Sequence, residues 1–215
     1  MLLRAAYGGG VYVPTQFALT DAETDAALAA GGFAHLVTPV AGGVVATPLP
    51  LLFDAASRSL VGHVARNNDH WRVAPVGESL AILPGPDAYV SPSFYASKAE
   101  HGRVVPTWNY DVLHVHGTLA VHDDVEWLRS LVTRLTDRFE SGRAAPWAVT
   151  DAPPAFVDGQ LRAIVGVSLS VTRVEGKAKM SQNRSAADRR GVADGLARSP
   201  WATDREVAER VRSTL

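Results

Sequence analysis

The chain has 215 residues, 47% apolar and 20% charged, which favours a folded domain with a sizeable core over a disordered chain. A formal net charge of −1 and a pI of about 6.7 give no overall positive field, which argues against a nucleic-acid-binding or membrane-binding protein. Because cysteine is absent, disulfides, thiolate metal sites and a cysteine nucleophile are excluded, and any metal must use other ligands.

The first third of the chain predicts one helix followed by strands. Thr20 and Glu23 form a capping box that predicts a helix over Ala22–Ala30. Pro48 and Pro50 predict an edge or a bulge, because proline donates no ladder hydrogen bond. The predicted strands are Phe33–Val40 and Val44–Phe53, joined as a hairpin through Ala41–Gly43, then Ser59–Ala65 and, after one helical turn over Asn68–Val73, a short strand Leu80–Leu83 ended by Pro84.

The stretch Ser59–Trp71 is the predicted cofactor site. Gly62 interrupts a run of strand residues, and glycine in a strand often marks the approach of a ligand or of another backbone. His63 would then project beside an open spot, with the cation and two amides of Arg66–Asn68 as an anion-holding rim. The alternative is a half-buried histidine followed by a solvated turn, and the residues alone leave both open.

Aromatic residues are concentrated between positions 89 and 110. Flat side chains with a few polar tips typically line a pocket for a planar ligand, although each of them can equally be a core residue with an internal partner. The aromatic residues are Tyr89, Phe94, Tyr95, Trp108 and Tyr110, and they alternate with Ser91, Ser93, Lys98, Thr107 and Asn109.

A strand with clean alternation begins at Leu113. His114, His116 and His122 fall on its polar face, with carboxylates just beyond, which raises the possibility of a metal site. A strand rises ~3.3 Å per residue, so His122 would lie more than about 20 Å from His114, too far to share an ion. At most two of the histidines could then share a metal, and we expect a solvent-facing row of histidines rather than a ligand set.

The last part of the chain alternates helices with a strand and a basic segment. Arg173–Arg190 holds six basic residues against two acids, which predicts an anion site or a solvated tail, and the amides Gln182 and Asn183 favour the site. The predicted elements are a helix capped by Asp123 and Asp124 and running to Phe139, a helix Phe156–Ala163, a strand Val165–Val171, a helix from Ser185, and a terminal helix started by a Thr203–Glu206 capping box.

Four motifs in this order resemble the PaiB-like proteins, the FMN-binding negative transcriptional regulators. They are LVGHVARNNDHW from Leu60, GPDAYVSPSFYASK from Gly85, VVPTWNYDVLHVHG from Val104 and IVGVSLSVTRVEGKAKMSQNR from Ile164. The resemblance implies an α+β, mainly β fold, the FMN-binding split β-barrel with flanking helices, paired as a homodimer with pockets at the subunit interface. It covers residues 1–196, with 197–215 as a C-terminal helix of the same domain.

The chain departs from the family pattern at two places. The usual His-Leu-Pro-Leu segment is replaced by Thr47–Leu51, and the usual Asn-Pro-Gln-Trp has become Asn68–Trp71. One branch of the family, the haem-dependent piperazate synthases, closes N5-hydroxyornithine into a cyclic hydrazine. Similarity to that branch implies haem b with His63 as the iron ligand, whereas the family as a whole implies FMN in a regulator or flavin-dependent oxidoreductase.

The resemblance to the synthases assigns provisional roles to the polar and aromatic residues. Lys98, if desolvated, is the expected base, and Tyr95 is the second catalytic candidate. Cofactor contacts are expected from His63, Arg66, Asn67, Trp108, Asn109, Lys177, Lys179, Gln182 and Arg184. The expected partners are an amino-acid substrate and a second copy of the chain, without a membrane or nucleic acid. The short apolar run at the N-terminus, residues 1–14, predicts no signal peptide and a cytoplasmic protein.

Overall fold

The computed structural model describes residues 10–215, which group into two compact units. The first unit contains the described part of Met1–Thr24 with Pro84–His114 and Glu175–Leu215, and the second contains Asp25–Leu83 and Val115–Val174. The C-terminal helix, expected over residues 197–215, belongs to the first unit. Part of the N-terminal run behind the signal-peptide prediction, residues 1–9, lies outside the described residues.

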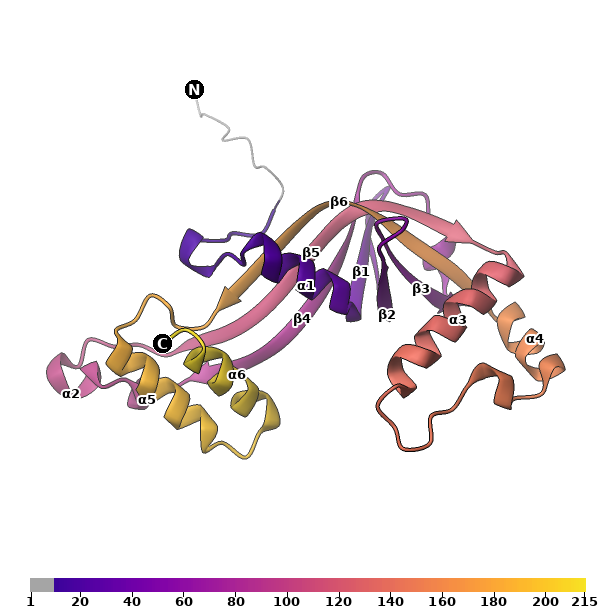
Figure 1. Ribbon diagram of the computed structural model, residues 1–215. Coiled ribbons are helices and arrows are strands. Elements are labelled where there is room, and N and C mark those ends of the chain that lie inside the picture. Colours follow the sequence, from indigo (N-terminus) through magenta and orange to yellow (C-terminus); the bar gives the residue numbers. More distant parts are fainter. Residues whose placement is uncertain (1–9) are drawn as a thin grey trace, which may run out of the picture. The chain divides into compact units, whose positions relative to one another are not determined.

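Six strands form a closed barrel in the order β1-β2-β3-β6-β5-β4 (Figure 1). The expected α+β, mainly β class is therefore confirmed. The strands are β1 Gly32–Val40, β2 Gly43–Asp54, β3 Ser59–Ala65, β4 Ser79–Val90, β5 Thr107–His122 and β6 Ile164–Lys179. The helices are α1 Asp21–Ala30, α2 Ser97–His101, α3 Val125–Glu140, α4 Pro154–Arg162, α5 Ala186–Ala197 and α6 Ala202–Arg212, with short 3-10 turns at Thr15–Phe17, Asp69–Arg72, Pro92–Phe94 and Val149–Asp151.

The hairpin of β1 and β2 tolerates its prolines because of its register. Val40 pairs with Gly43 across a two-residue turn, so hydrogen-bonded pairs recur at every second residue from there. Pro48 and Pro50 fall on the intervening pairs, where their nitrogens point away from β1. β2 pairs with β3 only over Leu52–Asp54, beyond both prolines, so the predicted edge position is confirmed.

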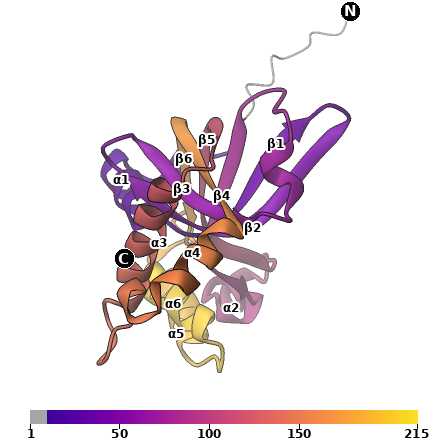
Figure 2. The same cartoon turned by 90° about the vertical axis from the view of Figure 1, so that its right-hand side faces the viewer.

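In the second unit, α3 and α4 pack together beside the barrel (Figure 2). α3 begins as predicted, because the Asp124 carboxylate accepts a hydrogen bond of 2.8 Å from the backbone N–H of Trp127. Leu131 and Leu135 of α3 pack on Leu52 and Val61 of the strands. This cluster fixes α3 over the face of β3 that also carries His63, because residues 61 and 63 share one face of a strand.

In the first unit, α5 and α6 form an antiparallel pair that packs on the C-terminal part of β4 (Figure 1). Their shared core contains Val90, Met180, Leu196 and Val207, all at most 1% exposed. The helix expected from Ser185 is present as α5, and Ser185 caps it, its hydroxyl accepting from the Asp188 backbone N–H. The predicted Thr203–Glu206 box is wrong, because α6 already begins at Ala202 and Thr203 lies inside it.

Three strands extend beyond their predicted ends. β4 continues through Pro84 to Val90, β5 already starts at Thr107, and β6 runs on to Lys179. The segment predicted as an anion site or tail therefore begins as paired strand. The strands also close into a ring, so an open barrel edge is no longer a reason to expect a dimer. None of the helices among residues 10–215 is long and apolar enough to cross a membrane.

Candidate functional site

His63 lies on β3 directly opposite Gly166 of β6. A Cβ atom at Gly166 would come within 2.2 Å of the Trp127 ring, so this glycine lets Trp127 of α3 lie against the strand beside His63. Gly62 does not make room for a ligand. A Cβ there would lie 2.7 Å from the Pro50 carbonyl oxygen, so Gly62 admits the backbone of β2.

The His63 side chain opens into a cavity of about 260 Å³ between β3, α3 and α4. Apart from His63, the described residues that line it are uncharged. They are Val132, Thr136, Trp147, Val149, Ala152, Phe156, Val157, Gln160, Leu161 and Ile164. The sequence prediction missed this aromatic and aliphatic wall, because Trp147 lies between predicted elements and Phe156 was assigned only to a helix.

The imidazole of His63 has a buried nitrogen without a partner. Nδ1 is buried and makes no hydrogen bond with any described residue. Burial lowers the pKa of His63, so the ring is neutral at pH 7. A neutral imidazole nitrogen with a free position is what a metal ligand requires, whereas a packing histidine normally has both nitrogens satisfied. A cavity does lie beside His63 as predicted, but residues between positions 132 and 164 line it, and Gly62, on which the prediction rested, instead admits the backbone of β2.

The predicted anion-holding rim is largely engaged in internal bonds. The Arg66 guanidinium pairs with both carboxylate oxygens of Asp123 and also donates to the carbonyls of Arg162 and Ile164. This pairing lowers the pKa of Asp123 below its usual value. Arg66 therefore ties the end of β3 to the start of α3, and Asn67 is exposed.

Asn68 and His70 hold the turn after β3, a feature that the sequence prediction did not include. His70 is 2% exposed, and its ring nitrogens lie 2.8 Å from the hydroxyls of Thr47 and Thr38. Asn68 donates to Thr47 and accepts from the His70 backbone N–H. The two departures from the family pattern, at residues 47–51 and 68–71, thus meet in one buried hydrogen-bonded network.

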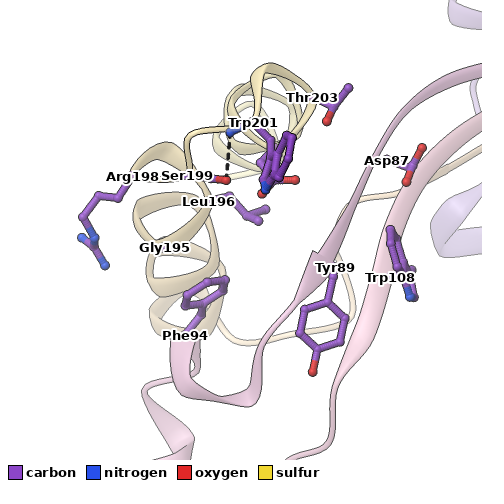
Figure 3. Close-up of a pocket in the computed structure, with 11 residues that line it drawn as sticks. Asp87, Tyr89, Phe94, Trp108, Gly195, Leu196, Arg198, Ser199, Trp201 and Thr203 are labelled. Carbon is purple, nitrogen blue, oxygen red and sulfur yellow. Dashed lines mark hydrogen bonds between the residues drawn. The ribbon is translucent and has the colours of Figure 1, made fainter.

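The aromatic residues between positions 89 and 110 lie in two kinds of surroundings, the core of the first unit and an open cleft. Tyr95 is 3% exposed in the core, with the Arg184 guanidinium 4.8 Å from its ring centre, and burial raises the pKa of its hydroxyl. Asn109 is fully buried and bonds to Ser181 at 3.0 Å. A cleft of about 550 Å³ is lined by three residues of this stretch, Tyr89, Phe94 and Trp108, and by residues of α5, α6 and their connection (Figure 3).

Three predicted site residues of the basic segment, Lys177, Lys179 and Gln182, make hydrogen bonds within the first unit. Lys177 is 7% exposed and donates to the Tyr12 carbonyl at 2.9 Å. Lys179 donates to the Trp108 carbonyl at 2.7 Å and to the Thr107 hydroxyl, and burial lowers the pKa of its ammonium group. The Gln182 side-chain amide makes two hydrogen bonds of 2.7 Å to the preceding backbone. It accepts from the Met180 N–H and donates to the Ala178 carbonyl.

Lys98 and the histidine row differ from their expected surroundings. Lys98 is exposed on α2 and donates to the Ser93 hydroxyl at 3.1 Å, so the desolvation that a lysine base needs is not met. The three histidines of β5 are half-buried rather than solvent-facing. His122 stacks on Trp127 with 4.1 Å between ring centroids and lies 2.7 Å from the Ser168 hydroxyl.

The predicted site residues fall into both units. His63, Arg66 and Asn67 lie in the second unit, whereas the remaining candidates lie in the first. Those in the first unit are Tyr95, Lys98, Trp108, Asn109, Lys177, Lys179, Gln182 and Arg184. His63 in the second unit and Tyr95 in the first each have a buried polar atom without a partner among the described residues, and Trp108 in the first unit lines a cleft.

Comparison with known proteins places this site in a recognised fold. Residues 11–173 match the family model described as "Putative FMN-binding domain". The chain is 29% identical over 209 residues to the Protease synthase and sporulation protein PAI 2 of Bacillus subtilis, covering 95% of this chain and 98% of that protein.

Two solved structures share the fold at low sequence identity. The flavocytochrome Anf3 from Azotobacter vinelandii has a TM-score of 0.53 and 16% identity over 75% of this chain and 69% of its own. The FAD and haem binding protein from Mycobacterium smegmatis has a TM-score of 0.53 and 19% identity over 74% of this chain and 71% of its own. The barrel is thus the split β-barrel that flavin-binding proteins use.

Proposed function

Because this chain belongs to the PaiB-like family of FMN-binding split barrels, we propose that it is a cofactor-dependent enzyme whose prosthetic group is held at His63. The observation that carries the proposal is the unpartnered, buried Nδ1 atom of a neutral imidazole at the edge of an apolar cavity. A buried polar atom left without a hydrogen bond costs about 1–3 kcal/mol, and a ligand bond would remove that cost.

Haem is the group that these residues fit best. The imidazole of His63 would hold its iron, and its apolar ring would suit walls such as Trp147, Phe156 and Val132. With about 260 Å³, the cavity is smaller than the ~300–1,000 Å³ typical of ligand pockets, so it would hold only part of such a group. Apart from His63, Gln160 and Thr136 are the polar residues with hydrogen-bonding side chains among those described as lining the cavity.

Flavin is the second candidate, and the family match favours it. FMN carries a phosphate group, which proteins usually hold with cations or with several backbone N–H groups. Among the described residues that line the His63 cavity, no side chain carries a positive charge. The uncharged lining therefore supports the apolar ring of haem at this cavity rather than the phosphate of FMN.

The proposed reaction is the closure of N5-hydroxyornithine to piperazate, with an N–N bond formed and water released. A bound haem would supply a Lewis-acidic iron that polarises the N–O bond, so that the α-amine can attack the terminal nitrogen and no external oxidant is needed. His63 would hold the iron, and the uncharged walls around it would exclude bulk water. Of the two residues expected to act in catalysis, Lys98 has a side chain open to solvent, whereas Tyr95 is buried.

Absorption spectroscopy of the purified protein, combined with a turnover assay, tests this proposal. We expect a strong band at the violet edge and formation of piperazate from N5-hydroxyornithine. His63→Ala should lose the band and the turnover, and added imidazole should restore part of the band by filling the vacated space. Paired near-ultraviolet and blue bands that survive His63→Ala would favour the flavin candidate, and a colourless protein that shifts operator DNA would favour a regulator.

A homodimer remains part of the proposal and rests on the family resemblance alone. Sedimentation equilibrium should give twice the monomer mass of 22.9 kDa at micromolar concentration. A monomer with its prosthetic group bound would contradict it.

A further inference from the structure

The first unit contains a cleft that is distinct from the His63 cavity. It lies between the strands β4 and β5 on one side and the α5–α6 pair on the other, and has a volume of about 550 Å³ (Figure 3). Its lining residues all belong to the first unit, and none of them lines the His63 cavity.

The walls of this cleft are aromatic and open to solvent. Tyr89 and Trp108, from neighbouring strands, meet edge to face with 6.1 Å between ring centroids. Tyr89 is 48% exposed, Trp108 53% and Trp201 68%. Trp201 lies at the start of α6 on the opposite side of the cleft (Figure 3). Large exposed aromatic surfaces gathered around one hollow mark a binding site more often than scattered exposure does.

The charges around the cleft are predominantly negative. Asp87 of β4 and Asp204 of α6 both line it, and among residues 10–215 neither carboxylate has a hydrogen-bond or ion-pair partner. Arg198 also belongs to the lining, but its guanidinium points away from the aromatic side chains (Figure 3). Asp204 stabilises the N-terminus of its own helix, whereas Asp87 lies on a strand and has no such role.

Aromatic faces and unpaired carboxylates both select positive charge. The face of a Trp or Tyr ring attracts an ammonium group within about 6 Å, and carboxylates add Coulomb attraction. A phosphate or carboxylate ligand would meet two like charges, and a neutral flat ligand would desolvate the carboxylates without compensation. We propose that this cleft binds an organic ammonium ion, with Trp108 and Trp201 against its apolar groups and Asp87 opposite its charge. The proposal is independent of the His63 site.

Choline and its neutral isostere 3,3-dimethylbutan-1-ol test the proposal, because they differ in charge but hardly in shape. Titration of the full chain, followed by NMR shifts of the indole N–H groups, should give a millimolar dissociation constant for choline and about tenfold weaker binding of the isostere. Equal binding of the two compounds, or no shift with choline at roughly 10 mM, would overturn the proposal.

Matched variants locate the site. Asp87→Asn and Trp108→Ala should each weaken choline binding about three- to tenfold. Asp25→Asn removes an exposed carboxylate elsewhere, and Phe139→Ala removes an aromatic ring that is 54% exposed, close to the 53% of Trp108. Both controls should bind choline as the wild type does. If Phe139→Ala weakens binding as much as Trp108→Ala, choline is binding to exposed rings in general and the proposed cleft is wrong. Unchanged thermal midpoints would confirm that the variants are folded.

Discussion

The segment at the end of β6 and the cavity beside β3 both contain polar residues that were predicted to bind the cofactor. They differ in whether the polar groups already have hydrogen-bond partners. Lys177, Lys179 and Gln182 all bond to backbone atoms or hydroxyls of their own unit. His63 keeps a buried nitrogen without a partner among the described residues. A polar group whose bonds are filled holds the fold together, whereas one left unfilled is available to a ligand.

The same contrast exists within seven residues of one stretch. His70 has both ring nitrogens engaged by hydroxyls, whereas His63 has Nδ1 unengaged. His63 is half-buried within β3 and His70 is buried in the turn after it. Burial lowers the pKa of both histidines. Their different hydrogen bonding predicts opposite consequences when each is replaced.

The largest effect on stability should come from His70→Ala. It removes two hydrogen bonds inside the second unit and leaves a cavity, so we expect the free energy of unfolding to fall by about 2–4 kcal/mol. His63→Ala should change it by no more than about 1 kcal/mol, because no hydrogen bond is lost at Nδ1. Urea denaturation of the cofactor-free proteins measures both. Equal losses would remove the distinction between the two histidines.

A smaller effect is expected from Gln182→Ala at the end of β6. The amide satisfies Met180 N–H and the Ala178 carbonyl, so its loss should cost about 1–2 kcal/mol of unfolding free energy. Cofactor content should stay at the wild-type value, because the amide is already used internally. A stable variant that loses its cofactor would show instead that Gln182 contacts the ligand.

The smallest effect concerns the pH dependence of stability. Burial lowers the pKa of His70, so the folded protein takes up a proton less readily than the unfolded chain, whose histidines titrate near 6.5. The contribution of His70 to stability is therefore complete above pH 6.5 and is lost as the pH falls below it. Denaturation at pH 7.0 and 5.5 should show that His70→Gln flattens this decline by up to roughly 1 kcal/mol per pH unit.

Two comparisons sharpen the pH experiment. The exposed His35 provides the control, since His35→Gln should leave the slope unchanged. Burial raises the pKa of Asp111 to about 6, which acts in the opposite direction, but this contribution is common to all three proteins and cancels in their differences. A slope that is the same in His70→Gln and the wild type would mean that His70 is not the group that titrates.

The sequence predicted correctly those features that depend on residues close together in the chain. The Thr20–Glu23 capping box is present, with the Thr20 backbone N–H 2.8 Å from the Glu23 carboxylate, and β3 has the predicted bounds Ser59–Ala65. The strands β4, β5 and β6 were predicted too short. Each continues through residues of loop-like or charged composition that are held by pairing with distant strands, which a single segment does not reveal.

The site was only partly predictable for the same reason. Residue type identified His63 and Arg66 as candidates, but Arg66 finds its carboxylate partner at Asp123, 57 residues along the chain. The cleft of the first unit combines Trp108 with Trp201 and Asp87, which no motif joins. Whether a polar side chain is free or satisfied depends on such distant partners, so sequence composition alone could not separate ligand groups from structural ones.

Titration of haemin into cofactor-free protein tests the role of His63 most directly. Wild-type protein should bind one equivalent with an imidazole-ligated spectrum, and His35→Ala should match it. His63→Ala should bind at least about 100-fold more weakly, a loss of roughly 2.7 kcal/mol, and should recover part of the spectrum with added imidazole. Equal haemin affinity and an unchanged spectrum in His63→Ala would show that the free nitrogen of His63 does not bind iron.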